Sequence, residues 1–535
     1  MTQHIFSYYN HIFPLMWNEP ALTDYNGTVS YTFGELAQQI SQVGEIFRAF
    51  GIKRGDKIAL CGRNSANWAT AYLSIAAYGA VIVSILQDFT GEDIQNLVSH
   101  SDAKLLMVGP YVQKQIDITK MPNLQGVVSL ADFSIISSIN SDLQVETAPT
   151  VTPDTFHLNE DNIDDLMLIN YTSGSMGQPK GVMLSYRSLS GNVAAGMQFL
   201  PNRPGDKLVS MLPLAHMFGQ LAEFLFPLAG GCHIYFLTKT PTPTILMKAF
   251  QDVQPYMVVT VPLIIEKICQ RMVFPAINRK VLRFFYKLPV TKNIIRRTIR
   301  KKLIKAFGAK LRYFIIGGAA LNPEVEELLH EIHFPFTVGY GMTECGPLIG
   351  GNYIDKTRKH SAGHILPRNE IKIDSNDPYN EVGEILVKGE HVMLGYYKNE
   401  KATKQAFTAD GWMRTGDLGL IDKDNYIYIK GRNKSMILGA SGQNIYPEEI
   451  EDKLKNMEGV AETLVVQREG KLVALVFPDY KGELNFNRTI RDVMRENLEK
   501  LNAVLPKYSQ ISKIELQDKE FEKTPKKSIK RFLYK

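Results

Sequence analysis

The N-terminal part of the chain alternates amphipathic stretches with short apolar runs. Apolar positions at helical spacing end at Phe50, and a turn leads into the apolar run from Lys57 to Leu60. Because strands and helices that alternate in this way form right-handed βαβ units, we predict a parallel sheet with helices on both faces. The further elements expected are helices at Asn64 to Gly79 and Thr90 to His100, and strands at Ala80 to Ile85 and Lys104 to Val108.

A turn rich in hydroxyl groups and glycines follows the apolar run from Leu166 to Ile169. It extends from Tyr171 to Gly181, and the pattern from Val182 to Leu189 is able to open a helix. Backbone N–H groups of such a turn form a concavity for anions, and hydroxyls and an ammonium add donors and charge. The turn is therefore suited to a polyphosphate. The residues concerned are Thr172, Ser173, Gly174, Ser175, Gly177 and Lys180.

Two better-known phosphate motifs do not fit this turn. The P-loop needs a lysine directly after its second glycine, but Gly177 is followed by Gln178. The dinucleotide fingerprint fails because Gly174 and Gly177 lack the first glycine of that pattern. The apolar flanks also argue against a flexible linker.

Length and composition indicate a soluble multidomain enzyme. A chain of 535 residues is too long for one hydrophobic core, and 44% hydrophobic with 22% charged residues is ordinary for globular proteins. The four cysteines lie far apart without metal-ligand spacing, and no export signal is recognisable, so we expect reduced thiols in the cytoplasm. The run from Leu73 to Leu86 is too short to span a bilayer, and a net charge of +6 implies no nucleic-acid partner.

The turn resembles the phosphate loop of the adenylate-forming superfamily, which includes acyl-CoA synthetases, peptide-synthetase adenylation domains and firefly-type luciferases. Further similar motifs follow in the family's order at Leu212 to Gly219, Gly317 to Leu321, Thr337 to Glu344 and Gly411 to Gly419. The resemblance implies an α/β fold. Residues 1–433 would form an N-terminal adenylation domain with two doubly wound subdomains and a small β-barrel-like unit. Residues 434–535 would form a small, mobile α+β domain.

The resemblance also assigns roles around ATP and the acyl group. Thr343 would bond the α-phosphate, and Glu344 would hold Mg²⁺, a hard cation that prefers carboxylate and phosphate oxygens. His216 would border the pocket for the acyl carboxylate, although a lone histidine in an apolar setting is more often a core residue. The adenine would lie against Gly318, Ala319, Ala320, Tyr340 and Gly341.

The later motifs would complete the nucleotide site and the hinge. Asp417 would accept hydrogen bonds from both ribose hydroxyls, and Arg432 would contact phosphate or ribose oxygens through its planar donor fork. Lys434 occupies the family's hinge position, where a small domain rotates between the two half-reactions. Gly383 to Gly389 and Gly395 to Tyr397 have the pattern of short strands in the small β unit.

The final motif departs from the family pattern. Alignment on Thr524, Ile529 and Arg531 puts Ser528 where the family has a lysine that reaches the substrate. Serine carries no cation, so either Lys526 or Lys527 supplies the charge through a shifted loop, or the first half-reaction is slowed. Of the two lysines we favour Lys527. Removing such a charge from developing anionic oxygen costs on the order of 3 kcal/mol.

A basic segment follows Val261 to Lys267, which is itself similar to long-chain fatty acyl-CoA synthetases. No acidic residue occurs between Glu266 and Glu324, whereas many lysines and arginines alternate with aromatic and apolar residues. Such a segment is either a solvated helical face or a peripheral contact with an anionic membrane surface, and the sequence favours neither. No nucleic-acid-binding signature accompanies it.

These observations predict an ATP-dependent acyl-CoA ligase for a medium- or long-chain fatty acid. ATP, Mg²⁺ and coenzyme A are the implied cofactors, and the predicted location is the cytoplasm or the inner face of the membrane. Two alternatives stay open at this point. One is an acyl-AMP ligase that loads an acyl carrier protein, and the other is a membrane-associated pseudoenzyme that binds nucleotide or lipid, which the serine at position 528 makes plausible.

Overall fold

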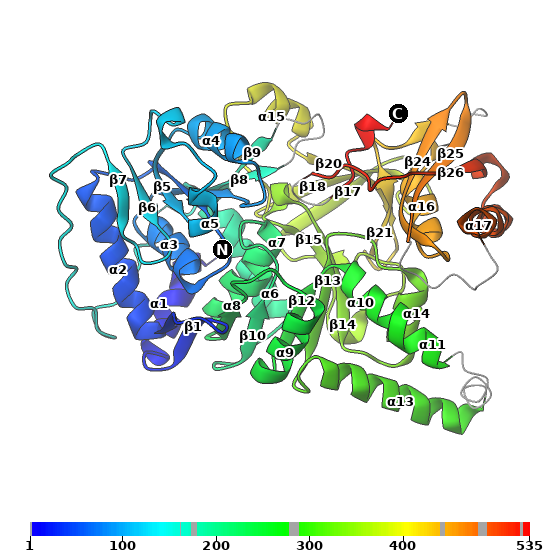
Figure 1. Cartoon of the computed structure of the whole chain (residues 1–535), viewed down its shortest axis with the longest axis horizontal. Coiled ribbons are helices and arrows are strands. Elements are labelled where there is room, and N and C mark those ends of the chain that lie inside the picture. The colour runs from blue at the N-terminus through cyan, green and yellow to red at the C-terminus, as the bar shows by residue number, and fades with distance from the viewer. Residues whose placement is uncertain are drawn as a thin grey trace. The chain divides into compact units, whose positions relative to one another are not determined.

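The computed structural model describes residues 3–160, 162–172, 179–277, 288–438, 444–479, 489–524 and 528–534 (Figure 1). The chain forms two compact units. Unit 1 contains Met1–Thr172, Pro179–Glu370 and Lys388–Gly411, and unit 2 contains Ile371–Val387 and Trp412–Lys535.

An eight-stranded sheet forms the first half of unit 1, in the order β19-β9-β8-β4-β3-β5-β6-β7. Its central strands pair in parallel and are almost wholly buried, as expected for a sheet covered on both faces. The predicted βαβ alternation is confirmed. Its strands are β3 (Lys57–Cys61), β4 (Val81–Ile85), β5 (Ala103–Val108), β6 (Gly126–Ser129), β7 (Ile135–Ser138), β8 (Leu166–Thr172), β9 (Lys180–Ser185) and β19 (Gly395–Tyr396).

The helices of this half begin at side-chain caps. Thr32 caps α2 in a capping box with Glu35, Ser65 caps α3, and Thr90 caps α4, each accepting from the backbone N–H three residues on. These caps satisfy donors that the first turn of a helix leaves free. The helices are α1 (Ile5–Leu15), α2 (Phe33–Ala49), α3 (Ala66–Ala77), α4 (Gly91–His100), α5 (Pro110–Gln113) and α6 (Tyr186–Phe199).

A nine-stranded sheet forms the second half of unit 1, in the order β16-β15-β14-β13-β12-β10-β11-β1-β2. Its central strands are parallel. One hydrophobic core of this half contains four buried phenylalanines, Phe250, Phe307, Phe314 and Phe334. Its strands are β1 (Pro20–Asp24), β2 (Ser30–Thr32), β10 (Lys207–Ser210), β11 (His233–Phe236), β12 (Met257–Thr260), β13 (Tyr313–Gly317), β14 (Phe336–Gly341), β15 (Leu348–Gly351) and β16 (His364–Ile365).

Several helices accompany this second sheet (Figure 1). A π-helical turn, Leu221–Leu225, lies between α7 and α8, and a second one, Cys269–Val273, lies between α10 and α11. The helices are α7 (Met217–Gln220), α8 (Phe226–Ala229), α9 (Pro243–Val253), α10 (Pro262–Ile268), α11 (Phe274–Ile277), α13 (Pro289–Ala306) and α14 (Pro323–Glu331). Helix α15 (Glu400–Ala406) instead packs beside β19 at the edge of the eight-stranded sheet.

Two sequence expectations about this unit are wrong. The stretch from Val182 does not open a helix, because Lys180–Ser185 is strand β9, antiparallel to β8, and α6 begins only at Tyr186 with Ser185 as its cap. Gly395–Tyr396 does not belong to the small β unit, because β19 pairs with β9 at the edge of the eight-stranded sheet. In the second case the partner strand, β9, lies far away from β19 in the sequence.

Unit 2 contains a four-stranded sheet and a three-stranded α+β layer. The first, in the order β17-β18-β20-β21, is the small β unit expected from the sequence, and the second carries the C-terminal helices as expected. The elements are β17 (Asn369–Asp374), β18 (Gly383–Gly389), β20 (Met413–Ile421), β21 (Ile427–Arg432), β22 (Ile437–Leu438), β23 (Asn444–Ile445), α16 (Pro447–Lys455), β24 (Val460–Arg468), β25 (Lys471–Pro478), α17 (Ile490–Val504) and β26 (Ile511–Leu516).

Candidate functional site

Lys180 begins β9 directly beside the end of β8. It is the register partner of Thr172, whose Oγ1 lies 3.5 Å from the Lys180 carbonyl oxygen. The ammonium Nζ of Lys180 lies 4.5 Å from the centroid of the Tyr396 ring, within the range of a cation–π contact. The remaining predicted phosphate-loop residues, Ser173, Gly174, Ser175 and Gly177, lie outside the described residues.

Glu344 lies on a short helical turn, Thr343–Cys345, that connects β14 to β15. β14 ends at Gly341, where an added Cβ would lie 1.9 Å from the Pro347 carbonyl oxygen, so only glycine allows the two strands to approach this closely. Thr343 is 8% exposed, and the Glu344 carboxylate Oε1 accepts a hydrogen bond from the Tyr396 hydroxyl at 2.9 Å. The hairpin thereby aims the acidic side chain at β19.

Tyr396 brings Lys180 and Glu344 to one place. Its ring contacts the ammonium, and its hydroxyl donates to the carboxylate. Burial raises the pKa of the Tyr396 phenol and the nearby Glu344 carboxylate raises it further, so the hydroxyl keeps its proton and acts as a donor. The lysine and the acidic residue that the sequence placed in two separate motifs therefore lie on one side of unit 1. Sequence reasoning missed Tyr396, because nothing in its local pattern indicates a partner 52 residues away.

Glu344 is suited to a metal that takes few protein ligands. Within the described ranges, no three His, Cys, Asp or Glu side chains converge on a common point. Mg²⁺ fits a single carboxylate, because it keeps several waters and binds substrate phosphates rather than a full protein cage. A metal such as Zn²⁺, which is held by three or four protein ligands, does not fit these residues.

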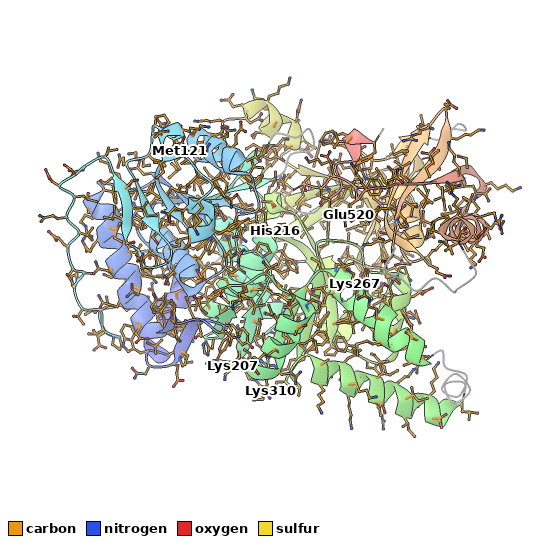
Figure 2. All side chains as sticks on the ribbon, in the orientation of Figure 1. Met121, Lys207, His216, Lys267, Lys310 and Glu520 are labelled. Atoms are coloured by element: carbon orange, nitrogen blue, oxygen red, sulfur yellow. The ribbon has the colours of Figure 1, made fainter. Side chains whose placement is uncertain are left out.

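Polar side chains from distant parts of the chain form hydrogen bonds with the backbone of the His216 loop, residues 214–216. His216 caps α7, and its Nδ1 accepts from the Phe218 N–H at 3.3 Å (Figure 2). Asn64 accepts from the Leu214 N–H at 2.9 Å, and Asn170 donates to the Ala215 carbonyl at 2.9 Å. The loop thus has a fixed shape before any substrate binds.

Glu223 is the most deeply buried acid beneath this loop. Its Oε2 accepts from the backbone N–H groups of Met211 and Leu212 at 3.0 and 2.9 Å and from the Ser210 hydroxyl at 3.1 Å. Its Oε1 has no hydrogen-bond partner among the described residues. Burial raises the pKa of Glu223 well above its ordinary value, and the hydrogen bonds that Oε2 accepts oppose this shift. No sequence motif indicated it.

The predicted adenine-binding residues follow β13 and end β14. Gly318, Ala319 and Ala320 are exposed directly after β13, and Gly318 has a φ of +84°, which favours glycine. Tyr340 is 7% exposed at the end of β14. β13 and β14 pair in parallel, so the two segments leave neighbouring strands at the same edge of the sheet.

Asp417 and Arg432 form an ion pair within unit 2. They are register partners on β20 and β21, and the Arg432 Nε lies 3.1 Å from the Asp417 Oδ1. The Asp417 side chain is 7% exposed, whereas that of Arg432 is 71% exposed. The two predicted nucleotide contacts are thus neighbours in one sheet. Lys434, the predicted hinge, is exposed just after β21.

The described residues of the last motif form a backbone hydrogen bond within the motif and an ion pair with α16. The Thr524 N–H donates to the Ser528 carbonyl at 2.8 Å, and Arg531 pairs with Glu451 on α16. Ser528 is exposed and carries no charge. Lys527, the predicted replacement cation, lies outside the described residues.

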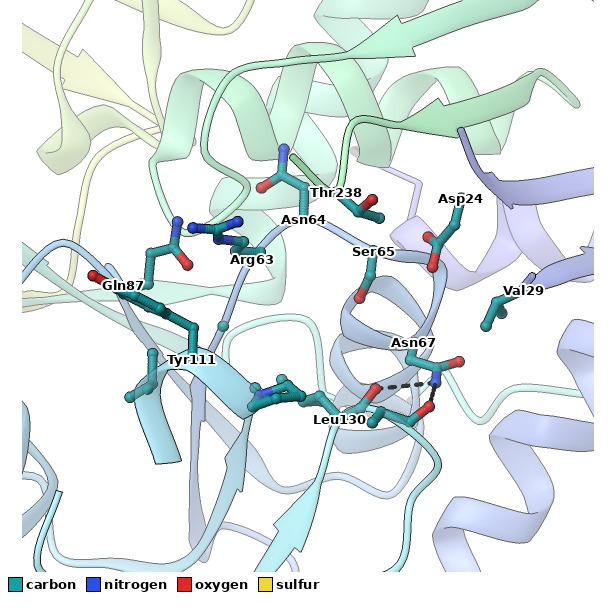
Figure 3. A pocket seen from close by; sticks show the side chains of 15 residues that line it. Asp24, Val29, Arg63, Asn64, Ser65, Asn67, Gln87, Tyr111, Leu130 and Thr238 are labelled. Atoms are coloured by element: carbon teal, nitrogen blue, oxygen red, sulfur yellow. Dashed lines mark hydrogen bonds between the residues drawn. The ribbon is translucent and has the colours of Figure 1, made fainter. Parts of the chain in front are cut away.

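A cavity of about 330 Å³ lies at the carboxyl ends of β3 and β5 in unit 1 (Figure 3). The strand order β4-β3-β5-β6 reverses direction there, which is the place where doubly wound sheets bind ligands. Gly62 and Gly109 allow the two loops to touch, and the Arg63 guanidinium lies 5.1 Å from the Tyr111 ring centroid. The sequence analysis did not identify this cavity.

The comparisons with known proteins agree over nearly the whole chain. The family model described as AMP-binding enzyme matches residues 16–397, and that described as AMP-binding enzyme C-terminal domain matches residues 434–534. The long-chain-fatty-acid–CoA ligase FadD15 of Mycobacterium bovis is 27% identical over 81% of this chain and 75% of its own length. The chloroplastic long-chain-fatty-acid–[acyl-carrier-protein] ligase AEE15 of Arabidopsis thaliana is 27% identical over 84% of this chain and 72% of its own.

Solved structures share the fold. The anthranilate CoA ligase AuaEII in complex with anthranoyl-AMP superposes with a TM-score of 0.79, at 20% identity, over 99% of this chain and 96% of its own. ATP-bound MatB of Rhodopseudomonas palustris superposes with a TM-score of 0.77, at 22% identity, over 99% of this chain and 98% of its own. The α/β architecture expected from the sequence is confirmed.

Proposed function

The chain belongs to the AMP-binding enzyme family, and from this premise we propose that it joins a fatty acid to coenzyme A by way of an acyl-adenylate. The observation that carries the proposal is the meeting of Lys180 and Glu344 at Tyr396. A cation for phosphate oxygens beside a carboxylate for a metal is the pair of groups that phosphoryl and adenylyl chemistry needs.

The first half-reaction requires little covalent chemistry from the protein. The fatty-acid carboxylate attacks the α-phosphorus of ATP, acyl-AMP forms, and pyrophosphate leaves. Lys180 and Thr343 would stabilise charge on the phosphate oxygens, and Glu344 would hold the metal. Bound Mg²⁺ would supply additional positive charge at these oxygens.

The substrate class rests on the relatives and on the His216 loop. The relatives named as long-chain-fatty-acid ligases support a long acyl chain, and the residues of the π-helical turn that follows His216 are buried. We assign His216 to the border of the acyl carboxylate pocket. The test is a chain-length series of fatty acids in ATP–pyrophosphate exchange, with Lys180→Ala expected to lower the rate roughly a hundredfold.

We place the division between the adenylating part and the C-terminal domain at Lys434, with rotation there between the half-reactions. Asp417 and Arg432 would hold the ribose and phosphate before the rotation. Lys527 is our candidate for the missing lysine of the last motif. Lys527→Ala should slow exchange, and a rate equal to that of the unmodified chain would assign the charge elsewhere.

The cavity beside Arg63 is our candidate for the nucleotide portion of coenzyme A. Its place at the switch point and its guanidinium suit an anionic ligand. Arg63→Ala should raise the KM for coenzyme A and leave pyrophosphate exchange unchanged. Product analysis with coenzyme A and with acyl carrier protein then separates the two ligase alternatives, and absence of fatty-acid-dependent exchange would favour the pseudoenzyme.

As a second property, we propose that the protein contacts a membrane surface through helix α13. Its Lys292 and Arg296 pair with Glu331 of α14, and Leu303 packs into the core, so its inner face is occupied. Figure 2 shows nitrogen-tipped side chains on the side of α13 that faces away from α9 and α10. Among the described residues, no helix combines the length and the apolar character that crossing a membrane requires. The exposed basic residues of α13 are Arg297, Arg300, Lys301, Lys302 and Lys305.

The membrane contact is tested with vesicles. Each lysine near an anionic surface contributes about 1 kcal/mol, so Lys301→Gln/Lys302→Gln should weaken binding to anionic vesicles roughly thirtyfold at low salt. The matched control is Lys401→Gln/Lys404→Gln on the exposed face of α15. Equal recovery with neutral and anionic vesicles would refute the contact.

A further inference from the structure

The segment from Met393 to Tyr397 fastens the Glu344 turn to strand β9. The Met393 N–H donates to the Glu344 carbonyl at 2.9 Å, and the Leu394 N–H donates to the Met183 carbonyl at 2.9 Å. The Tyr397 N–H donates to the Gly181 carbonyl at 2.7 Å, one residue beyond Lys180. The segment therefore touches both halves of the candidate phosphate and metal site through its backbone.

Tyr396 adds two side-chain contacts to this strap. Its hydroxyl donates to the Glu344 Oε1 at 2.9 Å, and its ring lies under the Lys180 ammonium at 4.5 Å. The Tyr396 residue is 9% exposed, and its backbone N–H donates to the Thr403 hydroxyl at 2.9 Å, which fixes the position of the ring. The hydroxyl thus contacts the negatively charged Glu344, and the ring contacts the positively charged Lys180, while the backbone of Tyr396 stays fixed.

We propose that Tyr396 is the positioning residue that orients the Glu344 carboxylate for the metal and the Lys180 ammonium for the phosphates. The proposal rests on the proposed adenylating function. The hydroxyl occupies one lone-pair direction of Oε1 and leaves the second oxygen, Oε2, for the cation. The ring restricts the long lysine side chain by its cation–π contact.

The hydroxyl and the ring are separable by substitution. Tyr396→Phe keeps the ring under Lys180 but removes the donor to Glu344. Loss of such an outer partner lowers metal affinity about tenfold, so the Mg²⁺ concentration for half-maximal pyrophosphate exchange should rise about tenfold. Saturating Mg²⁺ should restore most of the rate, and the KM for the fatty acid should stay unchanged. Tyr396→Leu removes the ring as well, and its KM for ATP should also rise.

Tyr397→Phe is the matched control. Tyr397 is the next residue of the strap, but its hydroxyl donates to Asp102 at 2.7 Å rather than to Glu344. It should keep the Mg²⁺ dependence of the unmodified protein. If Tyr397→Phe and Tyr396→Phe shift the Mg²⁺ dependence equally, the strap acts only on stability and the proposal is wrong.

A binding measurement separates this inference from the proposed function. Titration calorimetry of Mn²⁺ into the full chain, with a non-hydrolysable ATP analogue present, reports metal affinity without turnover. An approximately tenfold weaker Mn²⁺ affinity in Tyr396→Phe supports the role of the hydroxyl even if exchange is absent. An affinity equal to that of the unmodified chain overturns it, even if the unmodified chain is an active ligase.

Discussion

Gly341 offers a direct test of how closely the Glu344 hairpin must pack. A Cβ at this position would lie 1.9 Å from the Pro347 carbonyl oxygen and 3.2 Å from the Leu348 Cα. Real Cβ atoms essentially never come closer than 3.0 Å to another heavy atom, so in Gly341→Ala the two backbones must separate by about 1 Å. The bond from the Met342 N–H to the same Pro347 carbonyl, at 2.8 Å, must then lengthen or break.

This displacement acts on the turn that carries Thr343 and Glu344. A misplacement of about 1 Å in a positioned group can cost roughly a hundredfold in rate, which corresponds to about 2.7 kcal/mol of activation free energy. We expect Gly341→Ala to lower fatty-acid-dependent pyrophosphate exchange by that factor. Circular dichroism and thermal melting should be measured alongside, to show that the variant is folded.

Gly339→Ala is the control on the same strand. The nearest heavy atom to its added Cβ is the Gly350 carbonyl oxygen at 3.9 Å, an ordinary contact distance. This variant should exchange within about twofold of the unmodified chain, because strands tolerate alanine better than glycine where space exists. Gly341→Ala with a normal rate, or an equal loss in both variants, would refute the packing argument.

Three further outcomes follow from individual acidic residues. Glu344→Gln keeps the volume but removes the charge, so exchange should fall roughly a hundredfold across the whole Mg²⁺ range; a normal rate would remove Glu344 from the metal site. Glu223→Gln should keep the KM for the fatty acid, because the amide oxygen can accept from the same two backbone N–H groups, whereas Glu223→Ala should raise it by leaving them without an acceptor. Burial raises the pKa of Asp24 from an ordinary 3.8 to about 6 in the folded state. Between pH 3.8 and about 6, the folded state therefore binds a proton that the unfolded chain has lost, and the free energy of unfolding falls as pH rises through this range. Asp24→Asn should abolish this fall, which amounts to about 3 kcal/mol in the free energy of unfolding measured with urea. If the variant and the unmodified chain show the same pH dependence of this free energy, the argument is wrong.

Local sequence patterns determined the elements and the type of chemistry. Apolar runs and helical spacing gave the βαβ order of the first sheet, because a parallel sheet covered on both faces needs continuous apolar strands. The α+β character predicted for residues 434–535 is also found, because α16 (Pro447–Lys455) and α17 (Ile490–Val504) accompany a three-stranded sheet. Hydroxyls, glycines and a cation in one turn predict a phosphate site, because these groups act within a few residues of one another.

Only the tertiary structure decided how the distant motifs meet. Val182 lies in a strand because β9 is paired on both sides, by β8 and by β19, and the second partner is more than 200 residues away. The contact of Tyr396 with Lys180 and Glu344, and the burial that raises the pKa of Glu223, depend equally on long-range packing. Hydrogen bonding and desolvation act on groups that are close in space, and a linear pattern records closeness only between neighbours along the chain.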